Sequence, residues 1–201
     1  MTTRIAVITG STRPGRRGAL VADWVVQAAA SHPAVAAGEA AVDLIDLADL
    51  NLPLLDEAMP PIMGQYEHTH TKEWAATIDS YDGFLFVVPE YNHSFPGALK
   101  NALDYLYAEW NNKAAGFVGY GPGGGIRAVE QLRLVLAELK IAAVRDQVVI
   151  GKHDHADLFY QGVWTPTDET HAALELVLTE TLEWAEALKT VRAKAKTLAA
   201  A

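Results

Sequence analysis

Cysteine is absent from the 201-residue sequence. Both a disulfide framework and a thiol nucleophile are therefore excluded. No apolar run approaches the length that crosses a membrane, and the start, Met1-Thr2-Thr3-Arg4, carries no apolar region of the signal-peptide kind. We therefore expect a soluble, cytoplasmic protein.

Basic residues are few: 16 Lys and Arg stand against 25 Asp and Glu, which gives a net charge of −9. This balance argues against nucleic acid or an anionic membrane as a general partner. The length and a hydrophobic content of 50% suit a soluble domain with a sizeable core. We expect residues 1–201 to form a single domain whose tail frays after about residue 192.

Several motifs of nucleotide and hydrolytic chemistry are also missing. The loop after the first strand lacks the GxGxxG fingerprint, because Gly10 is followed by Ser11-Thr12, and the sequence contains neither GxSxG nor HExxH. Gly10–Gly15 has the GxxxxG spacing, but Arg16-Arg17 stands where a P-loop needs Lys followed by Ser or Thr. Histidine pairs in two predicted loops lack the converging ligands that zinc requires, so no metal site is predicted at His68, His70, His153 or His155.

The first strand and the loop after it predict a phosphate site. Ile5–Ile8 has the composition of a strand buried on both faces, and Thr9–Gly18, rich in glycine, hydroxyls and arginine, leads into a helical pattern. Backbone N–H groups at such a helix start hold phosphate. A solvated surface turn is the alternative. Three arginines at the positive end of a helix dipole are unfavourable without an anion, which favours the phosphate site.

The strand-and-helix pattern repeats five times along the chain. Such alternation predicts an α/β fold with helices on both faces of a doubly wound, five-stranded parallel sheet. Two long segments, Leu52–Thr71 and Gly151–Pro166, are expected to be irregular, and Ser94 is expected to cap the helix that follows it. The five strands are expected at residues 5–8, 40–47, 83–88, 113–119 and 143–150.

Three of the loops that follow strands carry chemically useful residues. They are Gly10–Gly18, Pro89–Ser94 and Tyr120–Gly125. In the sheet order 2-1-3-4-5, the strands that precede these loops are neighbours, and ligands bind at the carboxyl edge of such sheets. We therefore expect the three loops to form one site.

These loops also resemble a known family. GSTRPGRRG, PEYNHSFPGALKNALDYL and GYGPGGG are similar to the NAD(P)H-dependent FMN reductases, which include quinone, chromate and azo-dye reductases of flavodoxin-like fold. The resemblance spans Arg4 to Ile150. It implies bound FMN, NADPH or NADH as hydride donor, a small acceptor such as a quinone or free flavin, ping-pong kinetics, no obligatory catalytic side chain, and a homodimer or homotetramer.

The resemblance also implies a role for each loop. The first loop would bind the FMN phosphate, the second would lie along the isoalloxazine ring, and the third would approach the pyrimidine edge of that ring. Many family members have a serine near Arg16-Arg17 and another at Gly119-Tyr120, where this sequence departs from the pattern. The predicted cofactor-binding residues are Ser11, Arg13, Arg16, Arg17, Pro89, Glu90, Tyr91, Asn92, Tyr120, Gly121, Gly124 and Gly125.

Alternatives remain at this point. An FMN-binding electron carrier that does not oxidise NAD(P)H would show the same phosphate loop, as would a phosphate-site hydrolase. One group of residues has two interpretations: it supports the site or an oligomer interface, or it lies on a plain surface where Lys100 and Asp104 form an exposed pair. The group is Lys100, Asn101 and Asp104. The segments 52–71 and 152–166, the second with Phe159, Tyr160 and Trp164, shape either the acceptor pocket or an oligomer contact.

Overall fold

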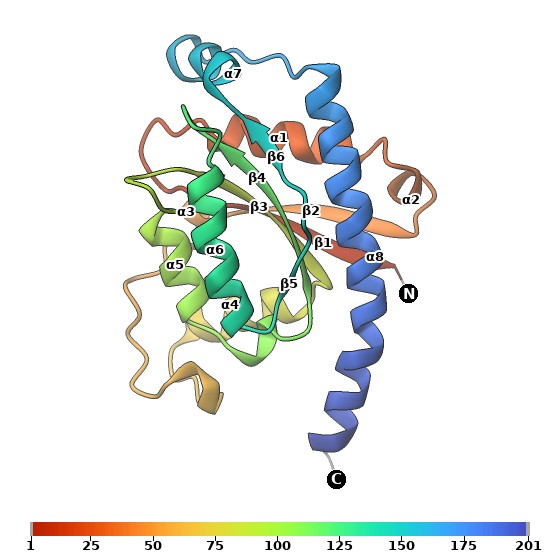
Figure 1. The fold of residues 1–201 in the computed structure, drawn as a ribbon. Coiled ribbons are helices and arrows are strands. Elements are labelled where there is room, and N and C mark those ends of the chain that lie inside the picture. The colour runs from red at the N-terminus through yellow and green to blue at the C-terminus, as the bar shows by residue number, and fades with distance from the viewer. Residues whose placement is uncertain (1, 200–201) are drawn as a thin grey trace.

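A twisted parallel sheet forms the centre of the structure, a computed structural model that describes residues 2–199 (Figure 1). The strands follow the order β2-β1-β3-β4-β5, and β6 also pairs with β4. The predicted order 2-1-3-4-5 is therefore confirmed. The strands are β1 (Thr3–Thr9), β2 (Ala40–Asp46), β3 (Gly83–Pro89), β4 (Ala114–Tyr120), β5 (Ala142–Ala143) and β6 (Val148–Ile150).

The prediction of one continuous fifth strand was wrong. β5 pairs with the start of β4 and β6 pairs with its end, and the pairing is interrupted after the Val144 N–H, which still donates to the Ala115 carbonyl at 2.9 Å. The guanidinium of Arg133 donates to the carbonyls of Val144 and Arg145 in this gap. A side chain thus takes the place of strand pairing at these carbonyls, since buried or half-buried carbonyls need a donor.

Helices cover both faces of the sheet, as Figure 1 shows for α8 on one side and α4, α5 and α6 on the other. The long helices are α1 (Gly18–Ala29), α4 (Thr69–Asp79), α5 (Gly97–Asp104), α6 (Ile126–Glu138) and α8 (Asp168–Ala199). The short helices and single turns are α2 (Pro33–Ala36), α3 (Leu47–Leu50), α7 (Lys152–Ala156), η1 (Pro61–Met63), η2 (Ala108–Trp110) and the π-helical turn η3 (Asp157–Gln161).

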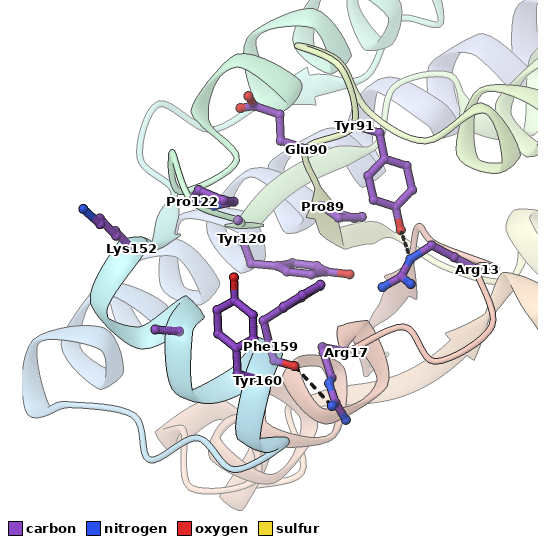
Figure 2. Close-up of a pocket in the computed structure, with 12 residues that line it drawn as sticks. Arg13, Arg17, Pro89, Glu90, Tyr91, Tyr120, Pro122, Lys152, Phe159 and Tyr160 are labelled. Carbon is purple, nitrogen blue, oxygen red and sulfur yellow. Dashed lines mark hydrogen bonds between the residues drawn. The ribbon is translucent and has the colours of Figure 1, made fainter.

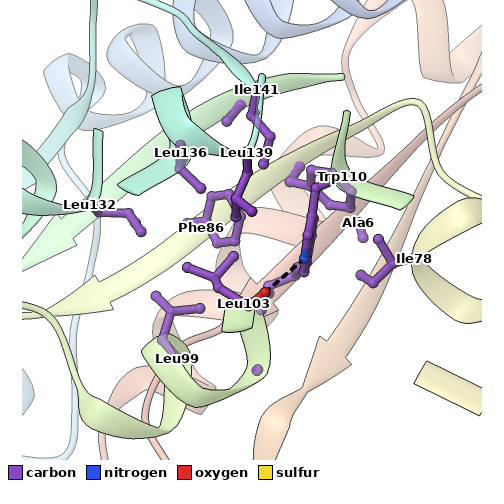
Figure 3. Close-up of a cluster of buried hydrophobic side chains, with 14 of the residues drawn as sticks. Ala6, Ile78, Phe86, Leu99, Leu103, Trp110, Leu132, Leu136, Leu139 and Ile141 are labelled. Carbon is purple, nitrogen blue, oxygen red and sulfur yellow. Dashed lines mark hydrogen bonds between the residues drawn. The ribbon is translucent and has the colours of Figure 1, made fainter. Parts of the chain in front are cut away.

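Successive strand residues divide the core into two layers, because side chains alternate between the faces of a sheet. Ile5 and Val7 of β1 pack toward α1 and α8, whereas Ile8 packs toward α4, α5 and α6. On the second face, Trp110 donates its indole N–H to the Leu103 carbonyl at 3.2 Å (Figure 3). Both faces of the central strands are therefore buried, as the apolar runs predict.

Two helix predictions require correction. Ser94 does not cap a helix: it exchanges backbone hydrogen bonds with Tyr91 in a tight turn, and α5 begins only at Gly97. The segment predicted to be irregular after Gly151 contains α7 and the π-helical turn. The last helix, α8, is described to Ala199, and Arg192 ties it to the carboxylate of Asp82 and the carbonyl of Asn112; fraying of the tail after about residue 192 stays a prediction.

The long loop before α4 is fastened to α5. The amide of Asn101 donates to the Pro53 carbonyl at 2.7 Å and accepts from the Leu55 N–H at 2.9 Å. The hydroxyl of Tyr105 donates to Asp56 at 3.0 Å, and burial together with this bond raises the pKa of Tyr105 to about 12. Asn101 therefore supports the loop, whereas Lys100 and Asp104 form an exposed pair at 2.6 Å.

Close packing of α8 on β4 depends on Gly116. A Cβ atom at this position would lie 2.5 Å from Thr181 Oγ1 and 2.7 Å from both Leu85 Cδ2 and Val177 Cγ1. We predict that Gly116→Ala lowers the free energy of unfolding by about 1–3 kcal/mol through overpacking. Thermal unfolding measures this loss. Gly97→Ala is the matched control, because a Cβ at Gly97 meets nothing within 4 Å; equal stability of the two variants would contradict the packing argument.

Candidate active site

A cavity of about 440 Å³ opens at the carboxyl ends of β3 and β4, beside the start of α1. Each of the three predicted loops contributes to its wall, so the structure brings them together. Figure 2 shows the arginines at one end of the cavity and Tyr120 across its middle. The lining residues are Arg13, Arg17, Pro89, Glu90, Tyr91, Tyr120, Gly121, Pro122, Lys152, Ala156, Phe159 and Tyr160.

The arginine end of the cavity lies at the start of α1. Arg17 occupies the N-cap position, no side chain caps the helix, and its first turn holds no acidic residue. The first N–H groups of a helix have no partner within it, so this start is suited to an anion. Arg13 and Arg17 add positive charge there, and both line the cavity.

Ser11 and Tyr91 join the first two loops. The Ser11 hydroxyl, fully buried, lies 2.7 Å from the Tyr91 hydroxyl, and Arg13 Nε donates to the same tyrosine oxygen at 3.4 Å. Ser11 Oγ also accepts from the Arg13 N–H at 3.4 Å. Tyr91 is thus more than a rim aromatic, because its hydroxyl fixes the second loop against the first.

Arg16 stands behind the wall of the cavity. Its Nη2 atom pairs with Asp46 Oδ2 at 2.6 Å, and both side chains are largely buried. Asp46 Oδ1 also accepts from the Ala48 N–H at 3.0 Å, which caps α3. Within the described chain, Arg16 Nε is buried and has no hydrogen-bond partner. Asp46 therefore neutralises the charge of this guanidinium and binds its Nη2 donor, while the Nε donor is unused.

The second loop turns sharply beside the cavity. Asn92 and His93 have positive φ angles of 49° and 74°, and the exposed Asn92 does not line the cavity. Glu90 lines it but forms an ion pair with Arg127 of α6. The remaining Glu90 oxygen, Oε2, is buried and has no partner among the described residues.

The third loop folds back on β4, and its glycines are required for this. Gly125 has a φ of 68°, and a Cβ there would lie 2.7 Å from the Tyr120 amide nitrogen. Gly124 also has positive φ, while Gly121 lines the cavity and donates its N–H to the Ile150 carbonyl at 3.2 Å. Gly124 and Gly125 therefore shape the loop from behind the cavity wall.

Tyr120 forms the floor of the cavity. Its side chain is buried, and this burial raises the pKa of the phenol well above its usual value. The hydroxyl lies directly over Gly18, where a Cβ would come within 2.6 Å of it. The absence of a side chain at Gly18 therefore leaves room for the Tyr120 hydroxyl. Because its pKa is raised, the phenol stays protonated near neutral pH.

One side of the cavity was not among the predicted site residues. Lys152, Ala156, Phe159 and Tyr160 come from the segment after β6. The aromatic residues Phe159, Tyr160 and Trp164 had marked this segment as part of either the acceptor pocket or an oligomer contact, but no periodicity indicated which.

The histidine pairs named in the sequence do not form a metal centre among the described side chains, which do not include that of His155. No group of three or more His, Cys, Asp and Glu side chains is arranged there to hold a metal ion. His68 and His70 instead stack at 5.1 Å, and His70 Nε2 lies 3.0 Å from Asp56. No helix between residues 2 and 199 has both the length and the apolar composition to cross a bilayer.

The sheet order and the site at its carboxyl edge define a flavodoxin-like protein, and known proteins support this class. FerB from Paracoccus denitrificans, described as a flavoenzyme NAD(P)H:(acceptor) oxidoreductase, has the same fold with a TM-score of 0.70. It is 21% identical, and the match covers 92% of this chain and 98% of FerB.

The model of the NADPH-dependent FMN reductase family matches residues 3–155, and the chain belongs to this family. An NAD(P)H-dependent FMN reductase, ntnL from Nectria sp, is 41% identical over 150 residues, 71% of this chain and 73% of the relative. A quinone reductase from Pseudomonas putida is 31% identical over 148 residues, 70% of this chain and 73% of the relative. The predicted family is confirmed, and the chain is an oxidoreductase of the FMN- and NAD(P)H-dependent kind.

Proposed function

We propose that the cavity binds FMN with its phosphate at the start of α1 and its ring between the second and third loops. The arrangement of charges in the wall carries this proposal: Arg13 and Arg17 lie at one end, beside an uncapped helix start. A phosphate there would also give a partner to the buried Arg16 Nε, because unpaired buried donors are costly. The residues present therefore fit the cofactor.

Each loop has its own task in this proposal. Ser11, Arg13, Arg16 and Arg17 serve the phosphate, directly or by fixing the loop. Pro89, Glu90 and Tyr91 line the side along which the ring lies, and Asn92 forms the turn just beyond it. Gly121 approaches the pyrimidine edge, supported by the fold of Tyr120, Gly124 and Gly125.

We propose that the enzyme transfers hydride from NADPH or NADH to a small acceptor such as a quinone or free flavin. FMN, held at the arginine loop and between the second and third loops, would supply the two-electron redox chemistry that links the donor to the acceptor. A quinone becomes a hydroquinone by gaining these two electrons, the proton carried with them and one proton from water. Donor and acceptor use the open side of the cavity in turn, which gives ping-pong kinetics.

The protein's side chains bind and orient in this scheme and need not exchange protons. Tyr120 stays protonated because burial raises its pKa, and Glu90 is held by Arg127. The Tyr120 phenol is therefore not a base at neutral pH, and one oxygen of Glu90 is occupied by Arg127. Double-reciprocal plots for a donor and a quinone should give parallel lines; intersecting lines would contradict the ping-pong order.

The decisive experiment is a visible spectrum of the FMN-reconstituted protein, recorded anaerobically before and after addition of NADPH and, separately, NADH. We expect the flavin bands to bleach within seconds. Bound flavin that stays oxidised with both donors would indicate an electron carrier. Failure to bind flavin would contradict the proposed cofactor site and would favour the alternative in which the loop Gly10–Gly18 belongs to a phosphate-site hydrolase.

Three further expectations stay predictions: a single domain, a cytoplasmic location, and assembly into a homodimer or homotetramer. Exposed apolar side chains on the loop before α4, among them Leu54, Ile62 and Met63, support the last of these. Light scattering of the purified protein would measure the mass in solution, and a monomer at micromolar concentration would contradict the assembly.

A further inference from the structure

The segment that closes one side of the cavity lies largely beyond the residues that match the family model. That match ends at residue 155, whereas Ala156, Phe159 and Tyr160 contribute to the cavity wall. Phe159 and Tyr160 are 42% and 80% exposed, and they lie edge to face with ring centroids 5.2 Å apart. Two adjacent aromatic side chains with this exposure at the mouth of a cavity are available to a ligand.

The backbone of this segment is anchored from below. Leu158, next to the aromatic pair, is fully buried in the core between the sheet and α1 and α8. Trp164 packs edge-on against Trp24 of α1, with ring centroids 4.9 Å apart. The segment is therefore tied to the core at Leu158 and again at Trp164, with the exposed pair just after the first anchor.

Arg17 provides a third anchor at the edge of the phosphate site. Its Nη2 atom donates to the Phe159 carbonyl at 3.2 Å. Gly162 has a φ of 67°, and a Cβ there would lie only 2.9 Å from Arg17 Nη1, so the turn rests directly on the guanidinium. A guanidinium has five N–H donors. The bond to Phe159 therefore leaves donors of Arg17 for a phosphate.

The local backbone accounts for the placement of the two rings. Residues Asp157–Gln161 form a π-helical turn, a rare conformation that occurs frequently at functional sites. Gln161 donates to Asp157 at 3.1 Å on the side away from the cavity. The turn thus buries Leu158 while both Phe159 and Tyr160 line the cavity (Figure 2).

We propose that Phe159 and Tyr160 form an aromatic wall that contacts the planar ring of the acceptor, and that Arg17 is the positioning residue that holds this wall. The inference rests on the proposed function and deepens it: the wall favours planar aromatic acceptors over acceptors without a ring. Aromatic side chains favour offset or edge-on packing against another ring, which gives a physical basis for the selectivity.

Binding of an acceptor without turnover tests the wall. The oxidised FMN-reconstituted protein, with no electron donor present, is titrated with 2-methyl-1,4-naphthoquinone, and the flavin difference spectrum gives the Kd. We expect Phe159→Ala and Tyr160→Ala each to raise this Kd about three- to tenfold. Trp184→Ala, which removes a 52% exposed aromatic on α8 outside the cavity wall, is the control and should leave the Kd unchanged.

Steady-state kinetics with two acceptors complete this test. The kcat/KM for the naphthoquinone should fall by a similar factor in both variants, and that for hexacyanoferrate(III), which has no ring, should not. Unchanged naphthoquinone binding, or equal losses with both acceptors, would overturn the wall. If the wild-type protein binds no FMN, or if NADPH does not bleach the bound flavin, the result would instead contradict the proposed function.

Hydrogen exchange tests the anchoring by Arg17 without FMN or substrate. Arg17→Met removes the guanidinium and leaves Gly162 in place, so it should speed amide exchange in residues 157–162 of the FMN-free protein several-fold. Arg13→Met is the matched control, since Arg13 also lines the cavity but bonds to Ser11, Tyr91 and Pro14 rather than to this segment. Equal exchange in the two variants would overturn the role of Arg17 as a positioning residue.

Discussion

Replacing Arg13 with alanine should weaken FMN binding about ten- to hundredfold and leave the affinity for riboflavin unchanged. Arg13 lines the cavity at the start of α1, and no acidic side chain between residues 2 and 199 forms an ion pair with it. Its charge is therefore available to a phosphate dianion. A charge-assisted hydrogen bond contributes about 1.5–3 kcal/mol, which corresponds to the expected loss.

The comparison of the two flavins makes this test specific, because riboflavin has the ring and the ribityl chain of FMN but no phosphate. Quenching of flavin fluorescence gives both Kd values for the wild type and the variant. Arg145→Ala is the control, since the Arg145 side chain is 91% exposed and forms an ion pair with its neighbour Asp146. Equal losses of affinity for both flavins would mean that Arg13 contacts the ring or supports the fold. An unchanged Kd for FMN would contradict a role of Arg13 in binding the phosphate.

The fold could be predicted from the sequence because its signals are local. Each central strand is an apolar run buried on both faces, and each is followed by a helix with one apolar side. The interrupted fifth strand could not be predicted in this way. Its break depends on Arg133, which reaches from α6 to the carbonyls of Val144 and Arg145. No pattern within residues 142–150 encodes a donor from another helix.

The candidate site divides along the same line. The positions of Arg13, Tyr91 and Gly121 at one sheet edge follow from strand order, which the alternation of elements predicts. The ion pair that neutralises Arg16 does not follow from strand order, because its partner Asp46 lies 30 residues further along the chain. For the aromatic wall, the sequence indicated segment 152–166 as part of either the acceptor pocket or an oligomer contact. It could not decide between them, because a single π-helical turn leaves no periodic signal, although it decides which side chains reach the cavity.

The ion pair between Arg16 and Asp46 is expected to contribute strongly to the stability of the fold. We predict that Asp46→Asn lowers the free energy of unfolding by about 2–3 kcal/mol, because it leaves the largely buried Arg16 without its counter-charge. Asparagine can still accept from the Ala48 N–H, so the cap of α3 is kept and the loss reports the charge. Denaturant unfolding of the FMN-free protein measures this loss.

The double variant Arg16→Met/Asp46→Asn separates stability from binding. Removing both charges should restore most of the lost stability, since an apolar replacement of a buried pair is often neutral. FMN affinity should nevertheless fall about tenfold, with riboflavin affinity unchanged, because Arg16 Nε is the unused buried donor that a phosphate would satisfy. Full FMN affinity in the double variant would make Arg16 a purely structural partner of Asp46. Stability that stays at the level of Asp46→Asn would instead show that the uncompensated charge of Arg16 was not the cause of the loss.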